Sequence, residues 1–211
     1  MFFDILKSIA RNKSLARTLM NLELRKYKIY GQVLDIGGGV NPSYFNFLQK
    51  EDVAPVKNLD SKNTAIDFEK DRLPADAESV DCVLMFNILE HIYNHNFLAG
   101  EIFRVIKKGG LVLGFVPFLV NYHPDPHDYF RYTEEALRKI FNQAGFADLK
   151  IKTVGHGPLA VNYNNIVFAF PRLARLAIFP LYYFMDCLLI KLKPDVTDRF
   201  PLGYLFTASK K

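Results

Sequence analysis

The residues with the most evident chemistry form a glycine turn that directly follows a short apolar run. The turn is Gly37-Gly38-Gly39, Asp35 lies just before it, and Asp60 closes the next apolar run along the chain. Glycines let a backbone approach a ligand closely and adopt positive φ angles. An acid at the end of the adjacent strand can accept two hydrogen bonds from a ribose diol. Together these features predict a site for an adenosine-type ligand.

The residues around this turn discriminate between two adenosine cofactors. A dinucleotide site is typical of the pattern G-x-G-x-x-G, whose third glycine opens a helix against the pyrophosphate. Pro42 occupies that third position, and Asp35 would lie beside two phosphates of like charge. The α-amino group and the sulfonium of S-adenosylmethionine are cationic, so a nearby carboxylate favours them. The residues therefore favour S-adenosylmethionine and disfavour a nicotinamide-dependent oxidoreductase.

A second group of titratable side chains lies in residues 121–132, after a predicted strand. Histidine titrates near neutral pH and is a natural base for taking the proton of a hydroxyl acceptor. We predict His127 as that base, with His123 as the second candidate and Asp128 as the group that orients an imidazole. The alternative is that Asp128, Arg131 and Tyr132 only hold the loop together through internal hydrogen bonds.

The elements that must position these residues alternate between apolar runs and helical patterns. Continuous apolar runs are typical of parallel strands covered on both faces, so the sequence predicts one α/β domain. The predicted strands are 32–36, 56–60, 65–68, 80–86, 111–116, 148–154 and 204–208. The predicted helices are 4–28, one that begins at Asn41-Pro42, 94–107 and one from Thr133 to Gly145. Ligands in such sheets lie beyond the carboxyl ends of the strands, where the glycine turn and Asp60 fall.

Composition excludes several classes of protein. The 211 residues are 50% hydrophobic and 23% charged, which allows a packed core and excludes a disordered chain. The net charge of +5 is too small and too dispersed to indicate nucleic-acid binding. Two cysteines, Cys82 and Cys187, exclude a disulfide framework. Since the N-terminus also lacks the features of a secretory signal, we expect a cytoplasmic protein.

Six motifs together carry a resemblance to a known family. They are VLDIGGG, VKNLD, IDFEKDRLP, VDCVLMFNILEHI, IKKGGLVLGFVP and HDYFRYTEEALRKIFNQAGF. Across them, from Gln32 to Phe146 and in the last strand, the chain resembles the class I S-adenosylmethionine-dependent methyltransferases of the type-11-like group. The resemblance implies a Rossmann-like, doubly wound sheet of seven mostly parallel strands with an antiparallel last strand. It also implies S-adenosyl-L-methionine as the cofactor.

The resemblance also implies roles for individual residues. It places Asp60 at the ribose, Asp67 and Phe68 at the adenine, and Asn87 near the methionine part of the cofactor. The full set of predicted cofactor-binding residues is Asp35, Gly37, Gly38, Gly39, Asp60, Ser61, Asp67, Phe68 and Asn87. Position 41, where the family usually has a further glycine, is an asparagine that could still cap a helix.

A metal is not expected from the same resemblance. Some quinone-biosynthesis relatives bind a metal with acids around the fourth-strand motif. Here Asn87 stands where the first of those acids would be, although Glu90 and His91 are kept. We expect no metal, and we expect Glu90 and His91 to form hydrogen bonds at the start of a helix.

The string HDYFRYT is similar to that of methyltransferases associated with cell-surface glycan synthesis. That similarity implies O-methylation of a glycan or of a lipid-linked precursor. A non-catalytic binding module that keeps the methyltransferase fold is the alternative.

Two segments outside the motifs have open interpretations. Residues 155–200 form an apolar helical insertion in the methyltransferase domain, 31–211, with cations near its ends. It could be an extra core layer, a lid, a homodimer face or a contact with a lipid interface. Residues 1–30 form a basic amphipathic helical segment that either packs on the domain or lies on the inner face of a membrane. We expect no spanning helix, because Pro180 and Asp186 interrupt the most apolar stretch.

Overall fold

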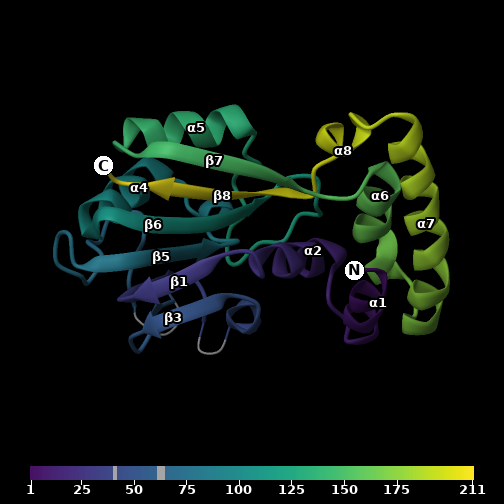
Figure 1. Ribbon diagram of the computed structural model, residues 1–211, viewed down its shortest axis with the longest axis horizontal. Coiled ribbons are helices and arrows are strands. Elements are labelled where there is room, and N and C mark those ends of the chain that lie inside the picture. The colour runs from purple at the N-terminus through teal and green to yellow at the C-terminus, as the bar shows by residue number, and fades with distance from the viewer. Residues whose placement is uncertain (40–41, 61–64) are drawn as a thin grey trace.

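The computed structural model describes residues 1–39, 42–60 and 65–211. Its centre is a six-stranded sheet in the order β4-β2-β5-β6-β8-β7 (Figure 1). The strands are β4 (Lys57–Leu59), β2 (Val33–Ile36), β5 (Val80–Phe86), β6 (Ile106–Pro117), β8 (Gly203–Ser209) and β7 (Ala147–Val154). β8 runs antiparallel to both of its neighbours, and the other strands are parallel to one another. The predicted mostly parallel sheet with an antiparallel last strand is confirmed.

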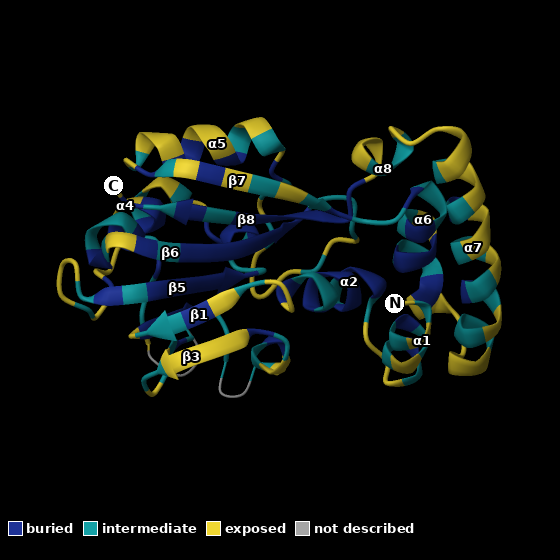
Figure 2. Ribbon diagram, in the orientation of Figure 1, coloured by how far each residue is buried: buried dark blue, intermediate teal, exposed yellow. Residues whose placement is uncertain are grey.

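Both faces of this sheet are covered, as the continuous apolar strands predicted (Figure 2). Successive side chains of a strand point to opposite faces. In β5, Val83 and Met85 accordingly pack into one core cluster, and Leu84 and Phe86 pack into the other. The first cluster lies under α4 (His95–Val105) and α5 (Glu134–Gln143), and the second lies under the N-terminal helices and the insertion.

Two predicted elements in the first half of the domain are different in the structure. The helix expected after Asn41-Pro42 is only the short turn η1 (Ser43–Asn46), and Asn41 itself lies outside the described residues. The chain then forms β3 (Gln49–Val53), which pairs in parallel with β1 (Lys28–Gly31) as a separate two-stranded sheet. Pairing of this segment with β1 leaves no room for a longer helix.

The predicted strand 65–68 is also absent from the described part of that segment. Residues 65–67 have no regular secondary structure, and a turn begins at Phe68. The Asp67 side chain accepts a hydrogen bond from the Glu69 amide of this turn at 3.0 Å. Asp67 also accepts one from the Asp71 amide through its carbonyl, at 2.8 Å. The main sheet consequently has six of the seven predicted strands.

The predicted helix 4–28 is split into α1 (Phe2–Ala10) and α2 (Leu15–Leu24). The break falls at Asn12, whose φ of 64° is in the left-handed region. Ser14 then caps α2 by accepting a hydrogen bond from the Arg17 amide at 3.2 Å. These helices pack on the insertion, since the Ala16 amide donates to the Asn164 side chain at 3.0 Å.

The insertion is helical, as predicted. Its elements are α6 (Pro158–Ile166), η3 (Val167–Ala169), α7 (Arg172–Leu192) and α8 (Val196–Arg199). α6, α7 and α1 lie together at one end of the sheet (Figure 1). Among the helices that the structure describes, α7 alone is long and apolar enough to cross a membrane by length and composition.

Candidate cofactor and acceptor site

The glycine turn leaves the end of β2 in a conformation that requires glycine. Gly37 and Gly39 have φ angles of 78° and 67°, in the left-handed region. The Gly37 amide donates to the Leu59 carbonyl at 2.6 Å, which joins the ends of β2 and β4. A Cβ on Gly39 would lie 3.5 Å from Asp60 Oδ2. The turn and Asp60 are thus brought together as predicted, whereas Ser61 lies outside the described residues.

Asp35 is fully buried directly behind the turn. The Tyr44 hydroxyl donates to this carboxylate and lies 2.6 Å from both of its oxygens. A Cβ on Gly38 would overlap the Asp35 carboxylate and the Tyr44 hydroxyl, so Gly38 is required for close approach. Burial raises the pKa of Asp35 to about 7, although the hydrogen bond from Tyr44 opposes the shift. A cation bound near this carboxylate would relieve the cost of burying it.

A cavity of about 800 Å³ opens at this edge of the sheet. Its volume is in the range of small-molecule sites, about 300–1,000 Å³. Of the predicted cofactor residues, Gly37, Gly38 and Asn87 line it directly, and Asp35 lies behind the wall that Tyr44 forms. Residues 121–132, which we call the acceptor loop, contribute His123 to the same cavity.

Asn87 follows β5 in an unusual backbone conformation. Its φ is 52°, and its amide donates to the Phe115 carbonyl at 2.9 Å. Asparagine tolerates the left-handed region better than most residues, so the sequence supplies a suitable residue at this position. Backbone strain of this kind is often found at functional sites.

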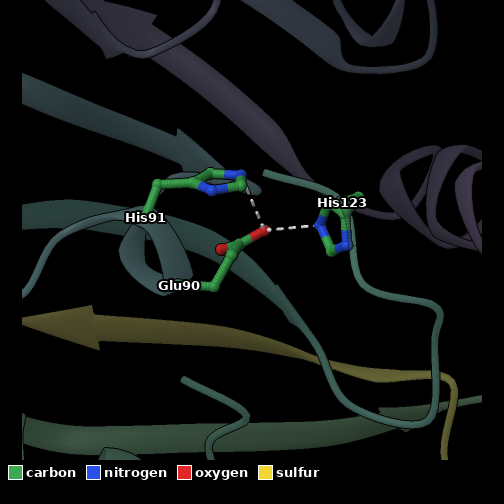
Figure 3. Close-up of side chains that lie close together, drawn as sticks. All are labelled: Glu90, His91 and His123. Atoms are coloured by element: carbon green, nitrogen blue, oxygen red, sulfur yellow. Dashed lines mark ion pairs between the residues drawn. The ribbon is translucent and has the colours of Figure 1, made fainter. Parts of the chain in front are cut away.

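Glu90 forms the most unusual electrostatic feature of the site (Figure 3). Its carboxylate is fully buried, and neither oxygen has a hydrogen-bond donor in the described structure. Oε1 lies 3.7 Å from His91 Nε2 and 3.5 Å from His123 Nε2, distances of ion pairs rather than of short hydrogen bonds. Interaction with Glu90 raises the pKa of His123 above its ordinary value, against partial burial, which lowers it.

The outer nitrogens of both imidazoles face backbone carbonyls. His91 Nδ1 lies 2.5 Å from the His127 carbonyl, and His123 Nδ1 lies 2.8 Å from the Asn121 carbonyl. If both Nδ1 atoms carry protons, both Nε2 atoms turn lone pairs towards Glu90. Two imidazole lone pairs facing a buried carboxylate are unfavourable without a positive charge among the three groups. The cluster is therefore suited to hold a proton.

The same three side chains could also hold a divalent cation. Their ligand atoms all lie within 4.8 Å of one another, and two imidazoles with a carboxylate are a donor set that transition metals accept. The sequence argument against a metal considered only the segment around Asn87, whereas the fold adds His123 from a distant loop. The expectation of no metal stays a prediction.

The acceptor loop is held by Asp128 rather than by its histidines. The Asp128 carboxylate accepts from Arg131 Nη2 at 2.7 Å and from the His123 amide at 2.9 Å. Hydrogen bonding from Arg131 lowers the pKa of Asp128 to about 2. Oδ2 of Asp128 also lies 3.6 Å from His123 Nδ1, so this acid helps to orient that imidazole.

His127, our first candidate for the base, is exposed and does not line the described cavity. Its ring lies against Tyr129, with 5.2 Å between the centroids, and its carbonyl is the group that contacts His91. The geometry therefore favours His123, the second candidate. Which of the two histidines reaches the cavity depends on how the loop folds. The loop has no periodic pattern, so the sequence does not reveal its fold.

The two predicted adenine contacts also lie away from the described cavity wall. Phe68 is buried in the core cluster that α4 covers. Asp67 forms an ion pair with Lys70 at 2.9 Å, which together with a backbone hydrogen bond lowers the pKa of Asp67. Their role at the adenine stays a prediction.

Sequence reasoning missed Tyr44, Lys13 and Arg17, which line the cavity. Tyr44 lies within η1, where a helix was expected, and Lys13 and Arg17 come from the N-terminal segment. Burial lowers the pKa of Arg17, whereas the nearby Tyr44 and Glu90 raise it. The only sequence signal for Lys13 and Arg17 was the alternation of cations with apolar residues in 1–30. That pattern does not show which surface of the protein the two cations face.

Part of the chain is similar to known methyltransferases. Residues 34–114 match the family described as a methyltransferase domain. Two proteins of Mycobacterium tuberculosis, each named "Probable S-adenosylmethionine-dependent methyltransferase", are 27% identical over 92 residues, or 41% of this chain. The match spans about a third of their length, 34%.

Solved structures share the fold. An S-adenosylmethionine-dependent methyltransferase from Archaeoglobus fulgidus superposes with a TM-score of 0.54 and 16% identity, over 97% of this chain and 98% of that one. Phosphoethanolamine N-methyltransferase 2 of Haemonchus contortus, in complex with S-adenosyl-L-methionine, superposes with a TM-score of 0.55 and 18% sequence identity. The superposition covers 90% of this chain and 52% of that one. The α/β fold is therefore that of known methyltransferases.

Proposed function

We propose that this chain is an S-adenosylmethionine-dependent methyltransferase that methylates a hydroxyl group of a glycan or a lipid-linked precursor. The observation that carries the proposal is the junction of the glycine turn with Asp60, beside a cavity that also contains His123. The match of residues 34–114 to a methyltransferase domain supports the same activity.

The residues present fit the cofactor. The buried Asp35 carboxylate, with its raised pKa, suits a cationic amino group close to it. Because Gly38 has no Cβ, the turn lies directly against Asp35 and Tyr44. Asp60 can accept hydrogen bonds from a ribose diol. When bound, S-adenosylmethionine supplies a methyl group that its sulfonium has already activated. The protein must therefore mainly position the acceptor and exclude water.

The cluster of Glu90, His91 and His123 is the group that we assign to the acceptor's proton. A hydroxyl that becomes methylated must lose its proton, and neutral His123 in the cavity wall can accept it. The buried Glu90 carboxylate, 3.5 Å away, then stabilises the imidazolium that forms. Asp128 and the Asn121 carbonyl hold the imidazole in place from the other side.

The cavity wall supports a glycan or lipid-linked acceptor through its other residues. Tyr122 and Phe168 line the cavity and are 74% and 51% exposed, so their rings are available to pack against a sugar. Lys13 and Arg17 line the same cavity and suit an anionic group such as a phosphate. A phosphate that links a sugar to a lipid combines both features.

Radiolabelled methyl transfer tests the proposal. The purified chain is incubated with methyl-labelled S-adenosylmethionine and either an organic-solvent lipid extract or a water-soluble glycan extract. We expect label in the lipid extract. The His123→Ala variant should transfer the methyl group at least about 100-fold more slowly. His127→Ala is the matched control and should keep its activity. No transfer to either extract, or equal loss in both variants, would contradict the proposal.

A further inference from the structure

The outward side of α7 is apolar along its whole length. Leu173, Leu181, Phe184, Leu188 and Leu192 are 82%, 61%, 60%, 59% and 69% exposed. Their spacing places them on one face of a helix, with Ala177 and Met185 between them. Figure 2 shows the exposed positions along the outer edge of the molecule. A single exposed leucine is ordinary, but a continuous stripe of this length marks an interaction surface. We call it the α7 stripe.

The opposite side of α7 is fixed to the protein. Phe179 is 2% exposed, and its ring stacks on Phe2 of α1 with 5.8 Å between the centroids. Asp186 is the helix's only acid and is fully buried. Its carboxylate accepts from the Leu159 and Ala160 amides at 3.1 and 2.6 Å, at the start of α6. The helix is thus held flat against α6 and α1, with no acid of its own on the exposed side.

Cations lie at both ends of the α7 stripe. Arg172, the first residue of α7, is exposed, and so are Lys191 and Lys193 at the other end of the helix. An apolar helical face between basic residues suits a bilayer that contains anionic lipids, because the apolar side chains enter the interface and the cations meet headgroups. Pairing with a second copy fits less well, since either a parallel or an antiparallel arrangement brings cations against cations.

The cavity lies next to one end of this helix. Phe168 lines the cavity and comes four residues before α7. The Arg175 guanidinium lies over the Phe168 ring, 5.3 Å from the ring centroid. Arg175 also donates to the Asn12 side chain at 2.5 Å, beside Lys13, which lines the cavity as well. A protein lying on a membrane through α7 would have its cavity close to the lipid headgroups.

We propose that the α7 stripe is a docking surface for an anionic lipid bilayer and that the helix lies flat in the interface. This proposal does not depend on whether the chain transfers methyl groups. It would deepen the proposed function by explaining how a lipid-linked acceptor reaches the cavity.

Vesicle flotation with the full chain tests the proposal. Phosphatidylcholine vesicles with and without about 30% phosphatidylglycerol are used, together with the double variant Leu181→Glu/Leu188→Glu. We expect the chain to float with anionic vesicles, less at high salt, and the double variant to partition at least about tenfold less. Lys139→Glu, at an exposed position of α5, changes the net charge by the same two units and should float normally.

Two further measurements keep the result interpretable. Circular dichroism checks that both variants fold, and calorimetry with S-adenosylhomocysteine checks that the cofactor site is intact independently of lipid. Failure of the chain to float with anionic vesicles would overturn the proposal. So would light scattering that shows a dimer of the chain and a monomer of the double variant, because a second copy would then cover the stripe. Flotation without methyl transfer would leave the docking surface standing and refute only the proposed function.

Discussion

Cofactor affinity should depend on pH through Asp35. Burial raises the pKa of this carboxyl to about 7 in the cofactor-free protein, so it is largely protonated at pH 6 and ionised at pH 8. A cationic amino group bound at the turn favours the ionised form, and binding below pH 7 must therefore release a proton. Affinity for S-adenosylhomocysteine, which keeps the amino group, should fall as the pH is lowered.

The size of the effect follows from the pKa. For a carboxyl that must be ionised in the complex, the apparent dissociation constant is multiplied by one plus the ratio of protonated to ionised carboxyl. With a pKa of about 7, that factor is about 11 at pH 6 and about 1.1 at pH 8, a tenfold change worth about 1.4 kcal/mol.

Isothermal titration calorimetry between pH 6 and 8 measures this change, with Asp35→Asn and Tyr44→Phe as variants. Asp35→Asn should bind more weakly at pH 8 and show no such dependence. Tyr44→Phe removes the hydrogen bond that lowers the pKa of Asp35, so its inflection should move to higher pH. His123→Ala is the control, because the pKa of His123 is also raised. A dissociation constant that stays flat in the unmodified chain would refute the reasoning.

The remaining predictions concern the turn and the proton-holding cluster. Gly38→Ala should abolish cofactor binding, because its Cβ would overlap Asp35 and Tyr44, whereas Gly100→Ala, with open space around it, should bind normally in the same titration. Glu90→Gln should lower the pKa of His123, so neutral imidazole would persist to lower pH; the acid limb of the pH–rate profile should shift to lower pH, and an unmoved limb would exclude this role. Chelation should leave the rate unchanged if the cluster holds a proton, and loss restored by a divalent metal would assign it as a metal site instead.

Local patterns were sufficient for the six strands of the main sheet and for the glycine turn. The runs around β2 and β5 are buried on both faces, so their continuous apolar character needs no knowledge of the rest of the fold. Gly37 and Gly39 have the positive φ angles that a turn of glycines implies. Asp60 meets the turn because parallel strands end at one edge of a sheet.

Contacts between segments that are distant in the sequence could not be predicted from local patterns. The segment 65–68 does not form a strand, because the Asp67 side chain and carbonyl accept hydrogen bonds from nearby amides, which compete with strand pairing. The choice of His123 over His127 depends on which imidazole reaches Glu90, and an irregular loop decides that. Arg17 joins the cavity only because α2 packs against the insertion.

A crystal structure of the chain with S-adenosylhomocysteine tests the central claim most directly. The account predicts the ribose hydroxyls on the Asp60 carboxylate and the amino group against the turn at Gly38, close to Asp35. Density for the nucleoside at any other position, with Asp60 turned away from it, would contradict the account.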